Sequence, residues 1–304
     1  MSKSTIRSFY DTRNVRFRRV RQKEHDEILE SNGNSVGVFE LEGTIFFGSA
    51  DTVSKQVLEK FDSDLKYVVL DLMRVNEMDS TAARILQQLQ KRLVSQEKLL
   101  FLSHVQPQSY LWNFMNDLGV IKTIGEENIF PDTDHAIEHC EELILKKHLK
   151  ENTFVHEEYP LDKLEIFQGL KSEEINLVSQ NMVVENFDKG DYVFQQGDTN
   201  DKFYYILQGL ASVYLPIPDS SYIKRMVTFG AGTTFGEMNL FALGPRSASI
   251  LAAESLTCIS MTIAEFERIK KNHPNLTYMM VFNLSKEFVR RTRRSDSIIK
   301  DLSQ

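Results

Sequence analysis

The sequence has few cysteines and lacks long apolar runs. Its 304 residues include two cysteines, Cys140 and Cys258, which lie far apart in apolar-patterned segments. This number and spacing exclude a disulfide framework and suit a reducing compartment. No secretory signal opens the chain, and no apolar run approaches the ~18 residues that would span a bilayer. We therefore expect a soluble, cytoplasmic protein, with the cytoplasmic face of a membrane as a further option.

Acidic residues outnumber basic ones, 43 to 36, except at one end of the chain. The net charge is −7, which excludes a general nucleic-acid binder, so we expect no DNA partner. Residues 1–23 differ, with eight basic residues against one acid, Asp11. We predict a basic N-terminal arm over residues 1–34. A solvated arm and attraction to an anionic membrane surface both explain this composition, and the sequence leaves both open.

The segment 35–149 alternates between strand and helix patterns. Such an order predicts an α/β domain built on one sheet. The expected elements are a hairpin over 36–47, helices over 50–61, 80–94, 107–119 and 132–149, and strands over 67–73 and 98–102.

Residues 150–163 are charged and unpatterned, and we predict that they form a linker. From 164 to 304 many short strands follow one another with glycine turns, which predicts a β-roll or jelly roll. A long helix from Asn275 to about Leu302 ends the chain. We expect its arginines, Arg290, Arg291, Arg293 and Arg294, to form a solvated face.

The stretch from Phe235 to Ile250 combines a glycine, a short helix, a proline and an arginine. Gly236 lets the backbone approach a ligand, and a following helix would direct free N–H groups at an anion. Arg246 supplies a planar cation that can hold two phosphate oxygens. Glu237 would repel a phosphate unless it accepts a hydrogen bond from a neutral group such as a sugar hydroxyl. A cyclic nucleotide offers both groups together.

This stretch resembles the phosphate-binding cassette of cyclic-nucleotide-binding domains, and the similarity covers about residues 162–302. The resemblance implies that Glu237 holds the ribose 2′-hydroxyl and Arg246 the cyclic phosphate of cAMP or cGMP. Asn239 departs from the usual small residue, and a β-roll corner without a ligand is the alternative. Ser247 does not decide between the two nucleotides. The predicted binding residues are Gly236, Glu237, Met238, Asn239, Arg246, Ser247 and Ala248.

The turn from Asp71 to Ala82 resembles the corresponding turn of STAS domains. In anti-sigma-factor antagonists of that fold, the serine at the position of Ser80 is phosphorylated. The resemblance therefore makes Asp79, Ser80 and Thr81 a candidate phosphorylation or partner site, with a kinase, a phosphatase or another STAS-binding protein as partner. Capping of the following helix by the same residues is the alternative.

A second resemblance covers about residues 8–150. Tyr10, the run from Glu40 to Ala50 and the run from Met78 to Ala82 are similar to the cytosolic tail of SulP anion transporters. This similarity implies a membrane transporter core as partner and places the basic arm beside a membrane. This chain contains no transport core, so it would transport nothing alone.

The helix over 132–149 contains a possible metal motif. His135 and His139 flank an acid with the spacing of inverted zinc peptidases. The helix is otherwise an ordinary amphipathic one, and no further ligand is recognisable downstream. We therefore expect outward-facing histidines and no metal.

We expect an α/β STAS sheet with flanking helices, then a β-roll (jelly-roll) cyclic-nucleotide-binding domain with C-terminal helices. The predicted function is a regulatory module that senses a cyclic mononucleotide and regulates, or derives from, a SulP-type transporter. The alternative is a signalling adaptor of the anti-sigma-factor-antagonist type, regulated by phosphorylation and cyclic nucleotide. We expect no enzymatic activity and no cofactor. The oligomeric state is open, with a homodimer among the options.

Overall fold

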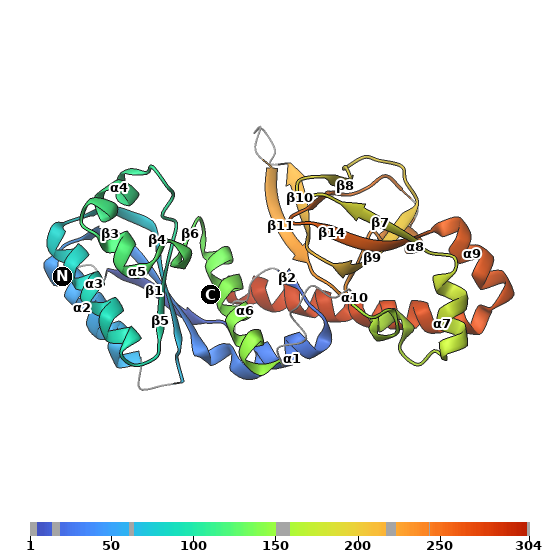
Figure 1. Ribbon diagram of the computed structural model, residues 1–304, viewed down its shortest axis with the longest axis horizontal. Helices are drawn as coiled ribbons and strands as arrows, with labels where there is room; N and C mark the ends of the chain where they lie inside the picture. Colours follow the sequence, from blue (N-terminus) through green and yellow to red (C-terminus); the bar gives the residue numbers. More distant parts are fainter. Residues whose placement is uncertain are drawn as a thin grey trace. The chain divides into compact units, whose positions relative to one another are not determined.

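The computed structural model describes residues 5–13, 19–60, 64–149, 159–216, 223–242 and 244–302 (Figure 1). The chain divides into two compact units. The first unit contains residues 1–17, 27–149 and 301–304, and the second contains residues 18–26 and 150–300. The chain therefore passes between the units after residues 17, 26, 149 and 300.

The first unit is built on one five-stranded sheet with the strand order β1-β3-β4-β5-β6. The edge strand β1 is antiparallel to β3, and the other pairs are parallel. Parallel pairs need crossovers, which helices provide here. The strands are β1 (Ile6–Asp11), β3 (Val36–Ile45), β4 (Tyr67–Met78), β5 (Leu99–Ser103) and β6 (Ile129–Phe130). The helices are α2 (Phe47–Lys60), α3 (Ser80–Val94), α4 (Tyr110–Asp117), α5 (Val120–Ile124) and α6 (Thr133–His148), with short 3-10 turns η1 (Gly33–Ser35) and η2 (Glu126–Asn128). The helix α1 (Lys23–Asn32) begins in the second unit and continues into the first after residue 26.

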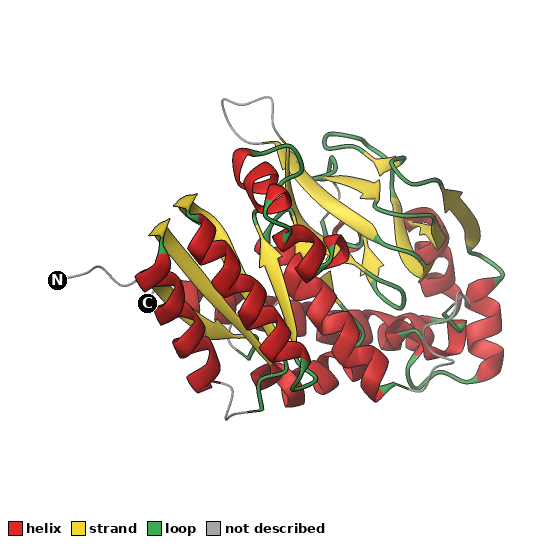
Figure 2. Cartoon of the chain, turned by 60° about the vertical axis from the view of Figure 1, so that its left-hand side comes forward, coloured by secondary structure: helices red, strands yellow, loops and turns green. Residues whose placement is uncertain are grey.

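Alternation along the central strands assigns their side chains to opposite faces. Leu70 and Leu102 join the apolar cluster that contains buried residues of α2 and α3. On the other face, Phe101 packs against His139 of α6, with ring centroids 5.4 Å apart. The expected α/β sheet with flanking helices is confirmed, and Figure 2 shows helices packed along its strands.

The predicted hairpin over residues 36–47 is wrong. Residues 36–45 form the single strand β3, which pairs with β4 along its whole length. Gly43 has a φ of +83°, and the register shifts beside it, so the glycine belongs to a bulge and not to a turn. β3 instead forms its antiparallel pair with β1, which lies within the predicted arm.

The second unit contains two sheets. Their strand orders are β2-β11-β10-β13-β8 and β12-β9-β14-β7. The strands are β2 (Arg19–Val20), β7 (Val183–Phe187), β8 (Tyr192–Phe194), β9 (Lys202–Gln208), β10 (Ala211–Pro216), β11 (Ile223–Phe229), β12 (Thr234–Phe235), β13 (Ser249–Ala252) and β14 (Leu256–Thr262). The predicted β-roll is therefore present, although the turn predicted after Pro216 lies outside the described residues.

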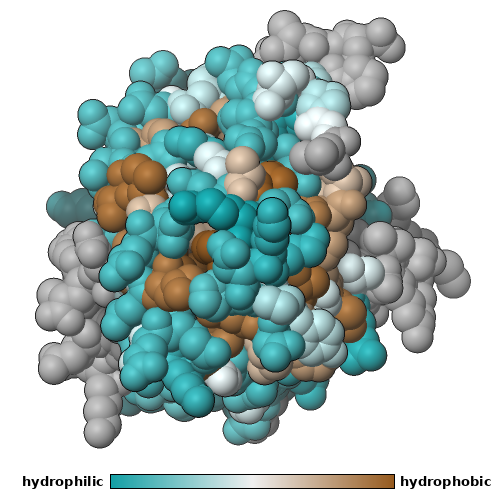
Figure 3. Space-filling model, turned by 90° about the vertical axis from the view of Figure 1, so that its right-hand side faces the viewer, coloured by the Kyte–Doolittle hydropathy of each residue, from teal (hydrophilic) through white to brown (hydrophobic). Residues whose placement is uncertain are grey.

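One apolar cluster of the second unit joins residues of both sheets, including Tyr204, Phe229 and Phe235. A second cluster joins the β9–β14 sheet to the helices. These are η4 (Leu161–Lys163), η5 (Glu165–Phe167), α7 (Ser172–Ser179), α8 (Met238–Phe241), α9 (Ile263–Asn272) and α10 (Pro274–Leu302). Figure 3 shows apolar patches among polar side chains on the side where α7 and α9 lie in Figure 1. Both cysteines are buried and free.

The structure divides the N-terminal arm predicted for residues 1–34. Within its described part, β1 belongs to the sheet of the first unit, and β2 pairs in parallel with Thr228 and Phe229 of β11 in the second. Arg21 is 3% exposed, so its charge is not available at the surface. Residues 1–4 and 14–18 of the arm lie outside the described residues. The predicted linker also overlaps the second unit, because η4 forms within it and residues 150–158 are not described.

Candidate functional site

The predicted cassette begins at the end of β12 in the second unit. Gly236 has a φ of +74°, which favours glycine, and a Cβ atom there would lie 3.0 Å from Nη1 of Arg246. Glu237 follows immediately and precedes the four-residue helix α8. The glycine therefore lets the Arg246 side chain lie directly against the turn that carries Glu237.

Arg246 is 5% exposed and is held by the backbone and by Asn200. Its Nη1 donates to the carbonyl oxygen of Gly236 at 3.0 Å, and its Nε donates to Oδ1 of Asn200 at 3.0 Å. Its Nη2 donates to the same amide oxygen and to the carbonyl of Lys202. The guanidinium also lies over the ring of Phe194, 4.1 Å from the centroid. Burial lowers the pKa of Arg246 below its ordinary value.

Glu237 is equally buried, at 5% exposure. Its Oε1 accepts a hydrogen bond from Nη1 of Arg291 in α10 at 3.0 Å. Nη2 of Arg291 also donates to the carbonyl oxygen of Thr234 at 2.6 Å and to the carboxylate of Glu287. Burial raises the pKa of Glu237 above its ordinary 4.5, and the charge of Arg291 opposes that rise. A buried cation and a buried anion thus lie on either side of Gly236.

The remaining predicted residues surround this pair. Asn239 is 7% exposed, and its Nδ2 donates to the carbonyl oxygen of Asn200 at 3.2 Å. Met238 is exposed, and Ser247 Oγ lies 4.0 Å from its sulfur. Ala248 is partly buried beside β13. Arg246 and Asn239 both contact Asn200, and Arg246 also contacts Gly236, so these predicted residues lie together at the turn that carries Glu237.

The sequence did not identify the two arginines of α10 that contact this site and its surroundings. Arg290 and Arg291 were expected on a solvated face, but both side chains form ion pairs and are mostly buried. Arg290 binds both carboxylate oxygens of Glu165, at 2.6 and 3.0 Å. Arg293 is exposed as expected, and the side chain of Arg294 is not described. The sequence shows a run of arginines on an amphipathic helix, but this pattern does not indicate which acidic residues they contact.

In the first unit, the predicted partner site lies at the start of α3. The carboxylate of Asp79 accepts a hydrogen bond from the backbone N–H of Ala82 at 2.6 Å and caps the helix. Ser80 and Thr81 are exposed. The capping function therefore belongs to Asp79, and the hydroxyl of Ser80 remains accessible for modification.

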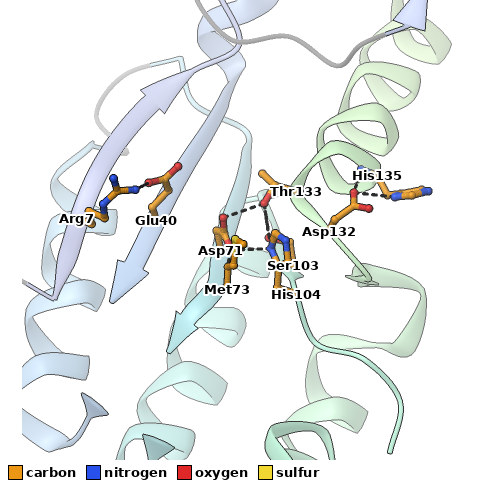
Figure 4. Close-up of polar contacts among 9 residues, drawn as sticks. All are labelled: Arg7, Glu40, Asp71, Met73, Ser103, His104, Asp132, Thr133 and His135. Atoms are coloured by element: carbon orange, nitrogen blue, oxygen red, sulfur yellow. Dashed lines mark hydrogen bonds and ion pairs between the residues drawn. The ribbon is translucent and has the colours of Figure 1, made fainter. Parts of the chain in front are cut away.

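A second polar cluster lies on the α6 face of this sheet, and the sequence did not point to it (Figure 4). Asp71 of β4 accepts hydrogen bonds from Met73 N at 2.8 Å and Thr133 Oγ1 at 3.0 Å, and it pairs with His104 Nδ1 at 2.9 Å. Ser103 Oγ lies 3.0 Å from Thr133 Oγ1. The cluster ties β4, the end of β5 and the first turn of α6 together.

These contacts change the titration of the pair. Burial would raise the pKa of Asp71, but the hydrogen bonds from His104, Met73 and Thr133 outweigh it and lower that pKa below 3.8. The hydrogen bond to Asp71 raises the pKa of His104 above 6.5. The pair therefore favours the charged form of both partners.

The possible metal motif in α6 has structural contacts instead. His135 Nδ1 lies 2.7 Å from Oδ1 of Asp132, the residue that caps α6. His139 packs against Phe101 and Phe130, so it does not face outward as expected. Among the described residues, no cluster of three or more potential ligands could hold a metal ion.

Comparison with known proteins assigns both units. Residues 27–136 match the STAS domain family, and residues 184–273 match the cyclic nucleotide-binding domain family. The chain is a STAS domain followed by a cyclic nucleotide-binding domain. Both matches lie where the two sheets lie, which confirms the predicted fold class. A domain pair of this kind is a cyclic-nucleotide-sensing regulatory module.

Similarity to single proteins extends over both domains. Glutaminase 1 of Bradyrhizobium diazoefficiens is 26% identical over 285 residues, covering 93% of this chain and 44% of that protein. The cGMP-dependent protein kinase of Plasmodium berghei is 30% identical over 115 residues, covering 38% of this chain and 13% of the kinase. A crystal structure of a cyclic nucleotide-binding domain from Methylobacillus flagellatus is 25% identical and covers 46% of this chain and 82% of its own, with a TM-score of 0.42.

The chain spans less than half the length of the two glutaminases that it matches, 44% and 47%. Within the described part of the chain, no helix has the length and apolar character needed to cross a membrane.

Proposed function

We propose that the cyclic nucleotide-binding domain binds cAMP or cGMP at the cassette and that binding changes how the STAS domain meets its partner. The observation that carries the proposal is a buried pair of opposite charges beside Gly236. The pair consists of Glu237 and Arg246, and each of these two residues is 5% exposed. A cyclic nucleotide has a singly charged phosphate close to a neutral sugar hydroxyl. The cation would bind the phosphate, and the carboxylate would accept a hydrogen bond from the sugar hydroxyl.

Ligand binding requires both residues to exchange partners. Arg246 donates to Asn200 and to the carbonyl oxygens of Gly236 and Lys202, so the phosphate competes with neutral acceptors. A charged phosphate oxygen is the stronger acceptor for a guanidinium. Glu237 is paired with Arg291, so a ribose hydroxyl competes with a cation there. The phosphate thus contributes most of the affinity, and the ribose contact links occupancy to α10.

Output through the STAS domain rests on its accessible surface at α3. Ser80 is exposed at the first turn of a helix, where a phosphate would be favoured by the helix dipole. A kinase, a phosphatase or another STAS-binding protein could recognise it. The two-domain similarity to proteins named glutaminase favours an enzyme as the regulated partner. We further propose that this chain regulates that partner and catalyses no reaction itself.

The transporter version of this proposal rests on the resemblance of residues 8–150 to SulP tails. It predicts salt-sensitive binding of the chain to anionic vesicles, because exposed charges are screened over ~8–10 Å at physiological ionic strength. Since Arg21 is buried and β2 pairs with β11, fewer basic residues are available than the sequence suggests. Equal binding to neutral and anionic vesicles would remove this version.

The test of nucleotide binding is a comparison of cyclic nucleotides with and without the 2′-hydroxyl, by competition against a fluorescent cyclic nucleotide. Loss of the hydroxyl leaves Glu237 without its ligand bond and should weaken binding ~10-fold. Glu237→Ala should weaken the complete nucleotide similarly and should no longer distinguish the two ligands. Equal discrimination by wild type and Glu237→Ala would show that the hydroxyl lies elsewhere. A linear 5′-monophosphate serves as the control for phosphate binding alone.

A further inference from the structure

The side chain of Asn200 occupies one edge of the Arg246 guanidinium. A guanidinium has two edges that each present a pair of N–H groups to an acceptor. The edge formed by Nε and Nη2 donates to Oδ1 of Asn200. The edge formed by Nη1 and Nη2 donates to the carbonyl oxygens of Gly236 and Lys202. A phosphate that binds either edge therefore has to replace an acceptor of this chain.

One of these three acceptors can leave without a change in the backbone. Lys202 begins β9 and pairs with Thr262 of β14, and Gly236 directly follows β12, which pairs with β9. Their carbonyl oxygens are thus held by the sheet. Asn200 lies outside the strands, and its amide moves by rotation about side-chain bonds. The phosphate should therefore bind the edge formed by Nε and Nη2, in place of the amide oxygen.

Further hydrogen bonds hold Asn200 beside the guanidinium. Nδ2 of Asn239, which is 7% exposed in α8, donates to the carbonyl oxygen of Asn200 at 3.2 Å. The segment before Asn200 is bonded to the backbone of Arg246. Gly197 N donates to the Arg246 carbonyl at 2.9 Å, and Arg246 N donates to the Asp198 carbonyl at 2.8 Å. The backbone of Asn200 is thereby fixed, so its side chain returns to Arg246 whenever that edge is free.

We propose that Asn200 is an internal ligand of Arg246, held in place by Asn239, and that it sets the rate and the concentration at which a cyclic nucleotide binds. This inference rests on the proposed function. A charged phosphate oxygen is a stronger acceptor than a neutral amide, so the nucleotide wins the competition once the amide has rotated away. The fraction of molecules with a free edge reduces the apparent affinity by that same fraction.

The competition acts on association and not on dissociation. Side-chain rotation is fast compared with the encounter of protein and ligand, so the free-edge fraction scales the association rate constant. After binding, the amide of Asn200 no longer touches Arg246, and its loss leaves the dissociation rate constant unchanged. A residue that contacts the nucleotide directly would have the opposite effect, because its removal speeds dissociation.

The test is stopped-flow fluorescence on the full chain with cAMP and cGMP that carry a fluorophore on the base. Asn200→Ala should raise the association rate constant up to ~10-fold and keep the dissociation rate constant within about twofold. Asn239→Ala should change association in the same direction by ~3-fold, since it acts only by loosening Asn200. Asn200→Asp keeps the shape and adds a charge that binds Arg246 more strongly, so association should slow by ~10-fold or more.

Asn186→Ala is the matched control. The amide oxygen of Asn186 in β7 accepts from Oγ1 of Thr257 at 2.9 Å, so this variant also loses an amide hydrogen bond, but one that does not involve Arg246. It should keep both wild-type rate constants. Urea unfolding of each variant shows that the rates are measured on folded protein.

The outcomes separate this inference from the proposed function. If the wild type binds nucleotide and Asn200→Ala associates no faster, or dissociates faster, the inference is wrong and the proposed function stands. If Asn200→Ala binds nucleotide and the wild type shows no binding at millimolar concentration, the internal ligand closes the site and both proposals are supported. If neither protein binds either nucleotide, both proposals fail.

Discussion

Replacing Arg246 by alanine should lower both the stability of the domain and its affinity for nucleotide, and the two effects can be measured separately. The side chain donates to Asn200, Gly236 and Lys202 and is 5% exposed, so its removal leaves buried acceptors without a charged donor. Each such bond contributes about 1.5–3 kcal/mol, but water entering the space compensates part of the loss. We expect Arg246→Ala to lower the stability of this domain by about 2–4 kcal/mol.

Arg246→Ala should also weaken the binding of the nucleotide. Arg246 is the cation that the phosphate needs, so its loss should weaken cyclic nucleotide binding about 10- to 1000-fold. Calorimetry measures the Kd under conditions where the variant is folded. Circular dichroism follows urea unfolding of the whole chain, and fluorescence of Trp112, the one tryptophan of the sequence, follows the STAS domain alone.

Arg293→Ala is the control, since Arg293 is an exposed arginine of the same domain. It should change neither the unfolding curve nor the Kd. The reasoning would be refuted if Arg246→Ala bound nucleotide within a factor of about two of wild type while remaining folded. Loss of stability without loss of affinity would assign Arg246 a purely structural function.

Three further predictions follow from the same contacts. Asn200→Ala removes a competing acceptor from Arg246, so nucleotide should bind up to ~10-fold more tightly in a calorimetric titration, and weaker binding would contradict the competition. The carboxylate form of Glu237 accepts the ribose hydroxyl and its pKa is raised, so affinity should fall as the pH is lowered toward that pKa from neutrality, whereas Glu237→Gln should give a flat profile. His104 has a raised pKa, so its contribution to the stability of the STAS domain is full below pH 6.5 and is lost as the pH rises through the folded-state pKa. His104→Gln should therefore lower the free energy of unfolding by ~1 kcal/mol at low pH and by less at high pH, measured by Trp112 fluorescence. A stability difference that does not depend on pH would contradict this prediction.

Most of the fold was predictable because local patterns determine it. The helix over 80–94 has the predicted bounds, since its apolar spacing and its capping residue lie within or next to the segment. The hairpin over 36–47 was mispredicted because a glycine such as Gly43 is typical of a turn. Gly43 does have a left-handed backbone, but it lies in a bulge. The strand β3 pairs in parallel with β4, which lies about 30 residues further along the chain. Only this long-range pairing shows that β3 is one continuous strand.

In the candidate site, too, contacts between nearby residues were predictable and contacts between distant residues were not. Glu237 and Arg246 lie within ten residues of each other, so their spacing identified the cassette. Arg291 is 54 residues from Glu237, and the pairing depends on how α10 packs. The two-residue strand β2 was also missed, because a run as short as Arg19–Val20 has no periodicity and forms only against β11.

The most direct test of the account is a calorimetric titration of the full chain with cAMP and with cGMP. The account predicts saturable binding of one nucleotide per chain, and it predicts that Glu237→Ala and Arg246→Ala each weaken that binding. No heat at millimolar concentrations of either nucleotide, or equal binding by wild type and both variants, would contradict it.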